Sequence, residues 1–362
     1  MRQLRMAVIG VGHLGKEHAR ILAGLPDVDL VGVVDVNLSQ AEMIAQRCGT
    51  KAFTKYTDLI GQIDAASIVV PTVYHHVVAK TFLQAGIPVL VEKPITATVT
   101  EAEDLVDLAC RQNLTLQVGH IERFNPAFEE LQLRPLQPKF IEAERHGPFT
   151  GRSTDIGAVL DLMIHDLDLL LSLVGGPVRS VEAVGASVFG GDEDVVNARL
   201  DFVNGCIANV TASRVSPKPK RRLRVWAPEG YAGIDFVQRR LTLVQPSEML
   251  RRDGLRLKEL DAAQRATLKD QIFGTHLETL ELDCNHGDQL TNELRHFVEC
   301  VRTGRRPRVT GQDGLAALSL AHRVLAALNQ HMWEGHDQGP MGPHQMPMPI
   351  GRMFDLPRVD AA

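Results

Sequence analysis

One short stretch near the start of this chain constrains its fold most: Gly10-Val11-Gly12-His13-Leu14-Gly15. The apolar residues 6–9 before it are typical of a strand, and residues 13–22 are typical of a helix. Three glycines at this spacing between a strand and a helix let the backbone pass close to a pyrophosphate, which then lies at the helix N-terminus. We therefore expect dinucleotide contacts from the loop residues Gly10, Gly12, His13, Leu14 and Gly15.

Asp35 lies 20 residues after the last of these glycines and indicates which dinucleotide binds. It ends a second apolar run, residues 30–34, where a carboxylate accepts hydrogen bonds from the adenosine ribose 2′-hydroxyl. The same carboxylate repels a 2′-phosphate, and Val36 and Asn37 follow it in place of an arginine. The sequence therefore predicts NAD as cofactor, in preference to NADP.

Length and composition exclude several classes of protein. With 362 residues, the chain is long enough for about two domains. Its 39 basic and 44 acidic residues give a net charge of −5, which argues against a general nucleic-acid binder. We expect neither a membrane span nor a signal peptide, because no run reaches the roughly 18 apolar residues of a membrane helix and the first strand starts near the N-terminus. Five scattered cysteines without a Cys-x-x-Cys pair indicate a reducing, cytoplasmic location.

Strands and helices alternate as far as residue 120, which predicts a parallel sheet with right-handed crossovers. The expected strands include residues 66–70, 88–91 and 114–118, with helices at 75–85 and 98–112. We therefore assign residues 1–120 to an α/β, Rossmann-type NAD-binding domain.

The pattern changes beyond residue 150, where an apolar helix (155–174) precedes a series of alternating strands. These are expected at residues 178–188, 195–203, 206–213, 222–227, 231–236 and 241–245. Asn204-Gly205 signals a hairpin between two of them, and late helices are expected at 288–303 and 312–329. Residues 121–330 should thus form an α+β domain for substrate binding and oligomerisation, with an open, mostly antiparallel sheet.

The tail, residues 331–362, is rich in proline, methionine and histidine and has no periodicity. Its histidines, His331, His336 and His344, do not have the spacing of a metal finger. We expect a loosely ordered tail and no metal site.

Glu92-Lys93-Pro94 directly follows the apolar strand 88–91. Ligands of such sheets bind beyond the carboxyl ends of the strands, so Lys93 should lie at the mouth of the cofactor crevice, beside Glu92. There it can hydrogen-bond the reacting hydroxyl and stabilise a developing alkoxide. A solvated lysine at a strand end is the alternative.

The helix expected at 155–174 is apolar nearly all round, yet Asp161, His165 and Asp168 share one stripe. A carboxylate one turn from an imidazole can fix its tautomer and raise its basicity, as a general base for alcohol oxidation requires. A polar stripe that simply faces water is the alternative interpretation.

Further polar groups follow other strand ends. Pro71, Thr72 and His75 come after strand 66–70 and are candidates for the nicotinamide end, although His75 and His76 can equally form a helix N-terminal pair. His120 and Arg123 follow strand 114–118. Arginines suit a pyrophosphate, so an anionic, nucleotide-linked substrate is indicated, whereas the basic residues 218–222 also fit a solvated loop. Substrate contacts are expected from Arg123, Arg145, Arg152 and Arg214, together with Lys93, Asp161 and His165.

Three motifs in order, the glycine loop at 10–15, Glu92-Lys93-Pro94 and Asp161-x-x-x-His165, resemble the Gfo/Idh/MocA family of oxidoreductases. The resemblance runs from residue 1 to about residue 330. It implies that Lys93 and His165 are catalytic and that Asp161 supports them. The segments 119–126 and 147–152 resemble the branch of UDP-N-acetylglucosamine 3-dehydrogenases, which oxidise the sugar 3-hydroxyl to a 3-keto sugar.

Three functions follow from these expectations. The first is NAD-dependent oxidation of the 3-hydroxyl of a UDP-linked N-acetylhexosamine. The second is oxidation of a free sugar or polyol such as an inositol, and the third is a non-catalytic NAD-binding regulator. The presence of both Lys93 and His165 argues against the regulator, which needs no base at the nicotinamide. The strands of the second domain must also bury a face, so we expect a homodimer or homotetramer.

Overall fold

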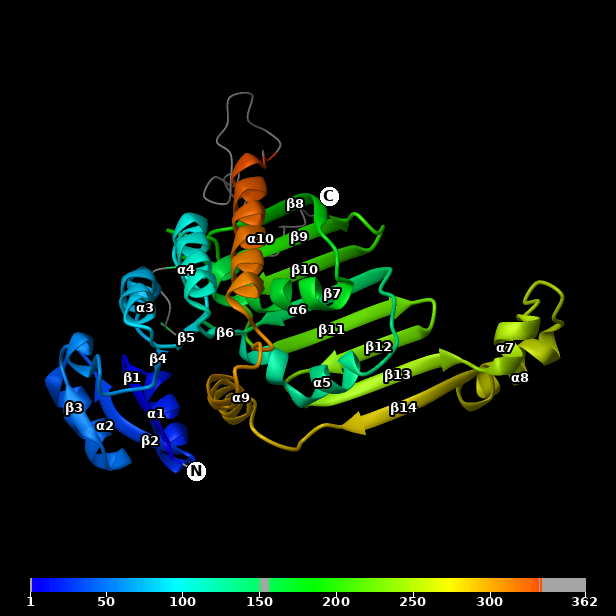
Figure 1. The fold of residues 1–362 in the computed structure, drawn as a ribbon. Helices are drawn as coiled ribbons and strands as arrows, with labels where there is room; N and C mark the ends of the chain where they lie inside the picture. Colours follow the sequence, from blue (N-terminus) through cyan, green and yellow to red (C-terminus); the bar gives the residue numbers. More distant parts are fainter. Residues whose placement is uncertain (1, 150, 152–155, 332, 334–362) are drawn as a thin grey trace, which may run out of the picture.

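The computed structural model describes residues 2–149, 151, 156–331 and 333, and it contains two sheets joined by long helices (Figure 1). Residues 152–155, which include Arg152, and the tail at 332 and 334–362 lie outside the described residues. None of the described helices has the length and apolar character that a bilayer crossing requires.

The first sheet has six strands in the order β3-β2-β1-β4-β5-β6, and all of its pairs are parallel. The order reverses between β1 and β4, which opens a crevice at the carboxyl ends of the strands. The predicted Rossmann half is confirmed. Its elements are β1 (Leu4–Ile9), α1 (Gly15–Gly24), β2 (Val28–Val34), α2 (Leu38–Cys48), β3 (Lys51–Phe53), β4 (Ala65–Ile68), α3 (His75–Gln84), β5 (Val89–Glu92), α4 (Val99–Gln112) and β6 (Leu116–Gly119).

The second sheet has eight strands in the order β14-β13-β12-β11-β7-β10-β9-β8. Only β7 and β10 pair in parallel, so the predicted open and mostly antiparallel sheet is confirmed. Its strands are β7 (Phe140–His146), β8 (Val178–Ala186), β9 (Val195–Phe202), β10 (Ile207–Ser213), β11 (Lys220–Ala227), β12 (Gly230–Asp235), β13 (Arg240–Pro246) and β14 (Leu277–Asp283).

Strands β3, β7 and β14 were not expected from the sequence. Strand β7 alternates buried with half-buried residues. The alternation is not visible in the sequence, because charged residues are frequent in this strand and one of them, Arg145, is itself buried. Strand β14 lies at the sheet edge and has no buried residue, so it carries no amphipathic signal. In the sequence, β13 and β14 are connected by an arm that contains α7 (Glu248–Asp253) and α8 (Ala262–Gln271) (Figure 1).

The helix expected over 155–174 is two elements. A π-helical turn, Val159–Met163, comes first, and α6 (Ile164–Val174) continues from it. A π turn inserts one residue into the helical repeat, so side chains on its two sides no longer share one stripe. This break decides where Asp161, His165 and Asp168 point.

The late helices connect the two halves of the molecule. Helix α9 (Gln289–Thr303) packs Leu294 and Phe297 into the core that contains β1. Helix α10 (Gly311–Gln330) runs beside α4 on one side and beside α6 and β8 on the other (Figure 1). Its Leu318 belongs to the core of the parallel sheet, whereas Ala317 and Val324 belong to the core of the second sheet. These helices fix the two halves against each other and so form the crevice between them.

Candidate active site

The turn between β1 and α1 has the shape that a dinucleotide requires. Gly10 has a φ of 87°, and a Cβ there would lie 2.6 Å from the carbonyl oxygen of Val69. A Cβ on Gly15 would collide with the carbonyl of Gly10, but a Cβ on Gly12 would meet nothing within 4 Å. Gly10 and Gly15 therefore permit close internal packing, whereas Gly12 leaves the open space that a pyrophosphate needs.

Asp35 lies beside this turn at the end of β2. Its Oδ2 accepts a hydrogen bond from the backbone nitrogen of Val11 at 3.1 Å, and its Oδ1 accepts one from that of Asn37 at 2.9 Å. The carboxylate is thus fixed against the glycine loop, where an adenosine ribose lies in Rossmann folds. The loop and the carboxylate together fit NAD.

Residues after β4 connect two strand ends on the same edge. Pro71 and Thr72 begin the short connection to α3. His75, at the start of α3, is buried, and its ring nitrogens each lie 2.8 Å from a backbone carbonyl oxygen, of Pro94 and of Val70. His75 therefore holds the loop after β5 against the end of β4, and so positions neighbours of the cofactor crevice.

Glu92 ends β5 and is also buried. Its Oε1 lies 3.3 Å from Nε2 of His18, a residue of α1. The other nitrogen of His18 lies 2.8 Å from the hydroxyl oxygen of Ser67 on β4. Glu92 thereby anchors the carboxyl end of β5 to α1, which fixes the direction in which the next residue, Lys93, leaves the sheet.

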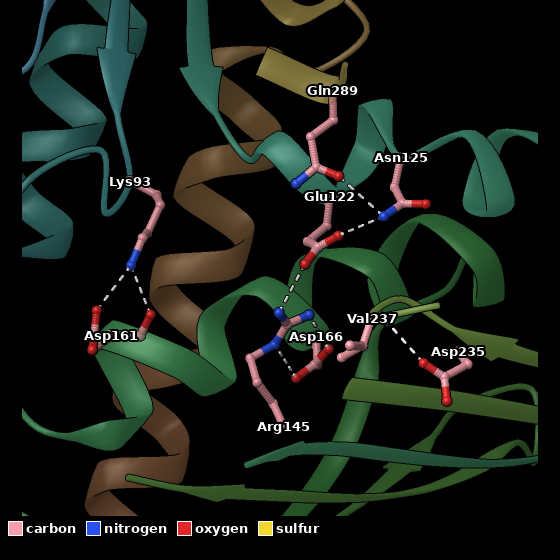
Figure 2. Close-up of polar contacts among 9 residues, drawn as sticks. All are labelled: Lys93, Glu122, Asn125, Arg145, Asp161, Asp166, Asp235, Val237 and Gln289. Carbon is pink, nitrogen blue, oxygen red and sulfur yellow. Dashed lines mark hydrogen bonds and ion pairs between the residues drawn. The ribbon is translucent and has the colours of Figure 1, made fainter. Parts of the chain in front are cut away.

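Lys93 spans the crevice between the two halves (Figure 2). Its Nζ donates to the backbone oxygen of Asp161 at 2.6 Å and to the Oδ1 of the same residue at 3.2 Å. The side chain of Lys93 is 16% exposed and that of Asp161 is 24% exposed, so both remain within reach of a small molecule. The π turn presents the Asp161 carbonyl and carboxylate together to one ammonium group.

His165 follows Asp161 on the first turn of α6. Burial is the main cause that lowers its pKa well below the usual histidine value, and the positive charges of Lys93 and Arg145 lower it further. Its Nδ1 is buried without a hydrogen-bond partner among the described residues. The imidazole is therefore neutral at physiological pH and can accept a proton.

The expected contact between the carboxylate of Asp161 and the ring of His165 is not found. The Asp161 carboxylate bonds to Lys93 instead, because the π turn breaks the stripe on which the two side chains were expected. Asp168 lies on α6 and has an arginine as its partner. It is buried with its Oδ1 3.6 Å from Nη1 of Arg123, and burial raises its pKa to about 7 despite the arginine.

His120 packs against His165, with ring centroids 6.4 Å apart and ring planes at 89°. Neither of its nitrogens has a hydrogen-bond partner in the described part of the chain. Burial, followed by the charges of Arg123 and Lys93, lowers its pKa to about 3. His120 is therefore a neutral, close-packed wall behind His165.

Arg145 is buried in a network of charges beneath this site (Figure 2). Its Nε and Nη2 donate to the two carboxylate oxygens of Asp166 at 2.9 and 2.8 Å, and its Nη1 donates to Oε1 of Glu122 at 2.8 Å. Asn125 donates to the second oxygen of Glu122 and, at 3.1 Å, to the side chain of Gln289. Burial opposes the charge on Arg145, but the two carboxylates outweigh it and raise its pKa.

Arg123 and Arg214, which were also expected to meet the substrate, have partners within the protein. Nε of Arg214 lies 2.5 Å from Oδ1 of Asp194, and its Nη1 donates to the backbone oxygen of Ile156 at 2.9 Å. Arg123 pairs with Asp168 and donates to the backbone oxygen of Arg308 at 3.2 Å. The sequence did not indicate these internal partners, because each lies on another segment of the chain.

Arg221 was considered from the sequence only as part of the basic residues 218–222 and was not counted among the expected substrate contacts. It lies at the start of β11, on the sheet face that also carries Leu223 and Val225. The expected strand began at residue 222, one residue too late to place Arg221 in phase with these buried residues. The period of two along a strand was the available signal, since it places Arg221 on the same face of the sheet as these residues.

No cluster of three or more metal-ligating side chains is found among the residues that the structure describes. With the fold and the crevice established, comparisons with known proteins define the family. Residues 4–120 match the family described as "Oxidoreductase family, NAD-binding Rossmann fold", and residues 132–232 match the "GFO/IDH/MocA C-terminal domain".

Individual relatives match along almost the whole length. The chain is 39% identical over 331 residues to UDP-N-acetylglucosamine 3-dehydrogenase of Acidithiobacillus ferrooxidans, covering 91% of this chain and 98% of that protein. A solved structure of that enzyme superimposes with a TM-score of 0.79, covering 90% and 98% of the two chains at 34% identity. The chain is also 28% identical over 347 residues to scyllo-inositol 2-dehydrogenase (NAD(+)) of Bacillus subtilis, covering 90% and 94%. The chain therefore belongs to the Gfo/Idh/MocA family of oxidoreductases, and its Rossmann half is an NAD-binding domain.

Proposed function

We propose that this protein is an NAD-dependent dehydrogenase that oxidises the 3-hydroxyl of a UDP-linked N-acetylhexosamine, UDP-N-acetylglucosamine, to the 3-keto sugar. The observation that carries this proposal is the meeting of Lys93 and Asp161 across the crevice, with the neutral His165 on the next turn. The 39% identity to a UDP-N-acetylglucosamine 3-dehydrogenase supports the choice of substrate.

In this proposal the cofactor lies along the β1–α1 turn, held by the loop residues 10–15 and by Asp35. Pro71, Thr72, Glu92 and His120 border its nicotinamide end, and His75 positions the loops there. When bound, NAD supplies the acceptor for a hydride from the substrate carbon. The remaining chemistry is the removal of one proton from a hydroxyl, which is the task of Lys93 and His165.

Lys93 Nζ has hydrogens that it already donates to Asp161, and it can donate another to the substrate hydroxyl oxygen. This bond strengthens as negative charge develops on that oxygen. His165 accepts the hydroxyl proton at Nε2, because its Nδ1 is buried and has no hydrogen-bond partner among the described residues. A ring held neutral by burial is ready for this role without first losing a proton.

A free polyol is the second candidate substrate. The 28% identity to an inositol dehydrogenase favours it, and the same three side chains suit any secondary alcohol. The two candidates differ in charge, since a UDP-sugar carries a diphosphate and an inositol carries none.

Incubation of the protein with NAD and a panel of UDP-sugars and polyols decides between the two substrates. We expect NADH absorbance to rise with UDP-N-acetylglucosamine, and Lys93→Ala to abolish most of that signal. A rise with inositols alone contradicts the proposed substrate. No rise with any alcohol favours a regulator over an enzyme.

We also propose that the protein is a homodimer or homotetramer assembled through the outer face of the eight-stranded sheet. Helices α6 and α10 cover the inner face, but the outer face is open and contains a hollow of about 600 Å³. Light scattering at micromolar concentration should show more than one chain per particle. Thr211→Arg, in this hollow, should shift the particle toward monomer, whereas Thr267→Arg on the exposed α8 should not. A wild-type monomer contradicts the proposal.

A further inference from the structure

A second hollow, of about 290 Å³, opens directly beside Asp161. The end of β7, the π turn and the start of β11 form its walls. Asp161 and Leu162 border it on one side, and the side chains of Phe149, Arg145, Arg214 and Arg221 border it elsewhere. Any substrate whose hydroxyl meets Lys93 and Asp161 therefore has this hollow as its neighbouring space.

The three arginines of this hollow differ in their partners. Arg145 is bound by Glu122 and Asp166, and Arg214 is bound by Asp194. The guanidinium of Arg221 has no hydrogen bond or ion pair to any residue in the described part of the chain, and Arg221 is exposed. Among the described residues, Arg221 is thus the arginine of this hollow whose guanidinium has no direct carboxylate partner.

Arg221 lies beside a second positive charge, that of Arg145. It pairs directly with Arg145 in the ladder between β11 and β7. Like charges opposite each other on neighbouring strands are destabilising. Arg221 also lies close enough to the site to affect His165, since burial is the main cause of the lowered His165 pKa and Arg221 adds to it. An anionic ligand bound at Arg221 would relieve this repulsion beside the reacting hydroxyl.

An exposed aromatic ring, Phe149, borders the same hollow, and a second exposed ring, Phe189, packs against it. Phe149 is 42% exposed and Phe189 is 57% exposed, and their ring centroids are 4.9 Å apart. The guanidinium of Arg214 lies over the Phe149 ring at 5.4 Å, so a cation stacks on one face of the aromatic pair. Exposed rings beside free positive charge suit a planar base linked to phosphates.

We propose that Arg221 binds the diphosphate of a nucleoside diphosphate substrate, and that Phe149 and Phe189 contact its base. This inference rests on the proposed function, because it assigns the substrate's phosphate and base to named residues beside Lys93 and Asp161. It also explains how a nucleotide-linked sugar is distinguished from a free polyol, which has no group for Arg221.

Calorimetric titration of UDP into the NAD-saturated protein tests this inference directly. Saturating NAD keeps UDP from the dinucleotide site. We expect Arg221→Ala to weaken UDP binding by 10-fold to 100-fold, as loss of a charge-assisted contact does. Arg222→Ala is the matched control, because Arg222 is the next residue, half-buried and paired with Asp235 at 3.2 Å, and it should bind UDP like the wild type.

Two smaller ligands separate the parts of the site. Arg221→Ala should weaken the binding of inorganic pyrophosphate and leave the affinity for uridine almost unchanged. Phe149→Ala should weaken the binding of uridine and leave the affinity for pyrophosphate almost unchanged. Arg221→Lys should recover part of the UDP affinity, because it restores the charge without the bidentate geometry.

The outcomes distinguish this inference from the proposed function. If UDP does not bind the wild type, or if Arg221→Ala binds it as tightly, the assignment of Arg221 is overturned. If UDP binds in an Arg221-dependent manner and yet no UDP-sugar reduces NAD, the pocket stands and the proposed dehydrogenase activity fails. If UDP-N-acetylglucosamine is oxidised, Arg221→Ala should raise its KM by 10-fold to 100-fold and change kcat by less than about 3-fold.

Discussion

The cofactor side and the substrate side of the crevice are built in different ways. On the cofactor side, the turn between β1 and α1 uses backbone shape, with Gly12 left open and Gly10 and Gly15 closely packed. On the substrate side, β7, the π turn and β11 bring charged side chains together from segments far apart in the sequence. The first site is one local motif, whereas the second exists only after the two halves have packed.

This difference teaches where each site is sensitive to change. A backbone cradle depends on a few glycines and tolerates changes elsewhere. An assembled charged site depends on whether every buried group has its partner, because an unpaired buried charge is costly. Mutations on the two sides should therefore separate cofactor binding from turnover and from stability.

The largest effect is expected at the residues that meet across the crevice. Lys93→Ala and His165→Ala should each lower kcat by about 10²–10⁴-fold, because positioned acid–base groups contribute that much. NAD affinity, measured by calorimetry, should change little, since neither side chain is part of the glycine cradle. Lys80→Ala, which removes a half-buried ion-paired lysine of α3, is the control. Near-normal kcat in both variants would refute the catalytic assignment.

A companion substitution sharpens that result. Asp161→Asn should reduce kcat less than Lys93→Ala does. The backbone oxygen of Asp161, which accepts from Lys93 at 2.6 Å, remains in the variant, as does a side-chain oxygen. A loss equal to that of Lys93→Ala would mean that the negative charge itself is required.

The buried network under the site should dominate stability. Arg145→Met leaves Glu122 and Asp166 without their cation, and removal of one partner of a buried pair typically costs about 3–5 kcal/mol. Urea unfolding measures this loss. Arg224→Met, which removes a half-exposed pair with Glu142 at 3.5 Å, should cost less than about 1 kcal/mol. Equal losses would show that burial does not set the importance of these pairs.

Two histidines of the site, His120 and His165, should make the stability of the protein sensitive to mild acid. The folded state keeps His120 neutral down to a pKa of about 3, and burial likewise lowers the pKa of His165. Unfolded histidines bind protons below a pH of about 6.5, so the unfolded state gains protons first and stability falls as pH decreases. Each such histidine costs about 1.4 kcal/mol per pH unit in this window.

Unfolding free energies at several pH values below 6.5 check this expectation. His120→Asn removes one titrating group and should flatten the dependence on pH. The exposed His13 lies outside the buried site, so His13→Asn should keep the wild-type slope. An unchanged slope in His120→Asn would contradict the account of a neutral, buried ring.

The smallest effect is expected on cofactor choice. Asp35 should give NAD at least a tenfold advantage over NADP in kcat/KM, which corresponds to about 1.4 kcal/mol. Asp35→Ser combined with Val36→Arg should move the preference toward NADP, since it replaces a repelling carboxylate with a cation. Asp29→Ser, on the same strand but remote from the loop, is the control. Comparable wild-type values with both cofactors would contradict the role given to Asp35.

Much of the fold was predictable because its signals are local. The alternation of short apolar runs with helices predicted the parallel sheet, and Asn204-Gly205 marked the turn between β9 and β10. Strand β7 was not predicted, because its inward positions include Arg145, and from the sequence alone an arginine indicates a solvent-facing position. Only its carboxylate partners, on η3 (Ile121–Phe124) and α6, make that position suitable for a charge.

The sequence by itself determined the glycine turn, Asp35 and the placement of Lys93 at a strand end, since each depends on backbone geometry over a few neighbouring residues. The tertiary structure alone decided which charges are free. It placed the Asp161 carboxylate on Lys93 and not on His165, through a π turn that no local pattern marks. Among the described residues, it also left the guanidinium of Arg221 without a hydrogen bond or ion pair, beside the paired Arg145. The partner of a charged group can lie on a distant segment of the chain. The energy of that group depends on its burial, which only tertiary packing creates.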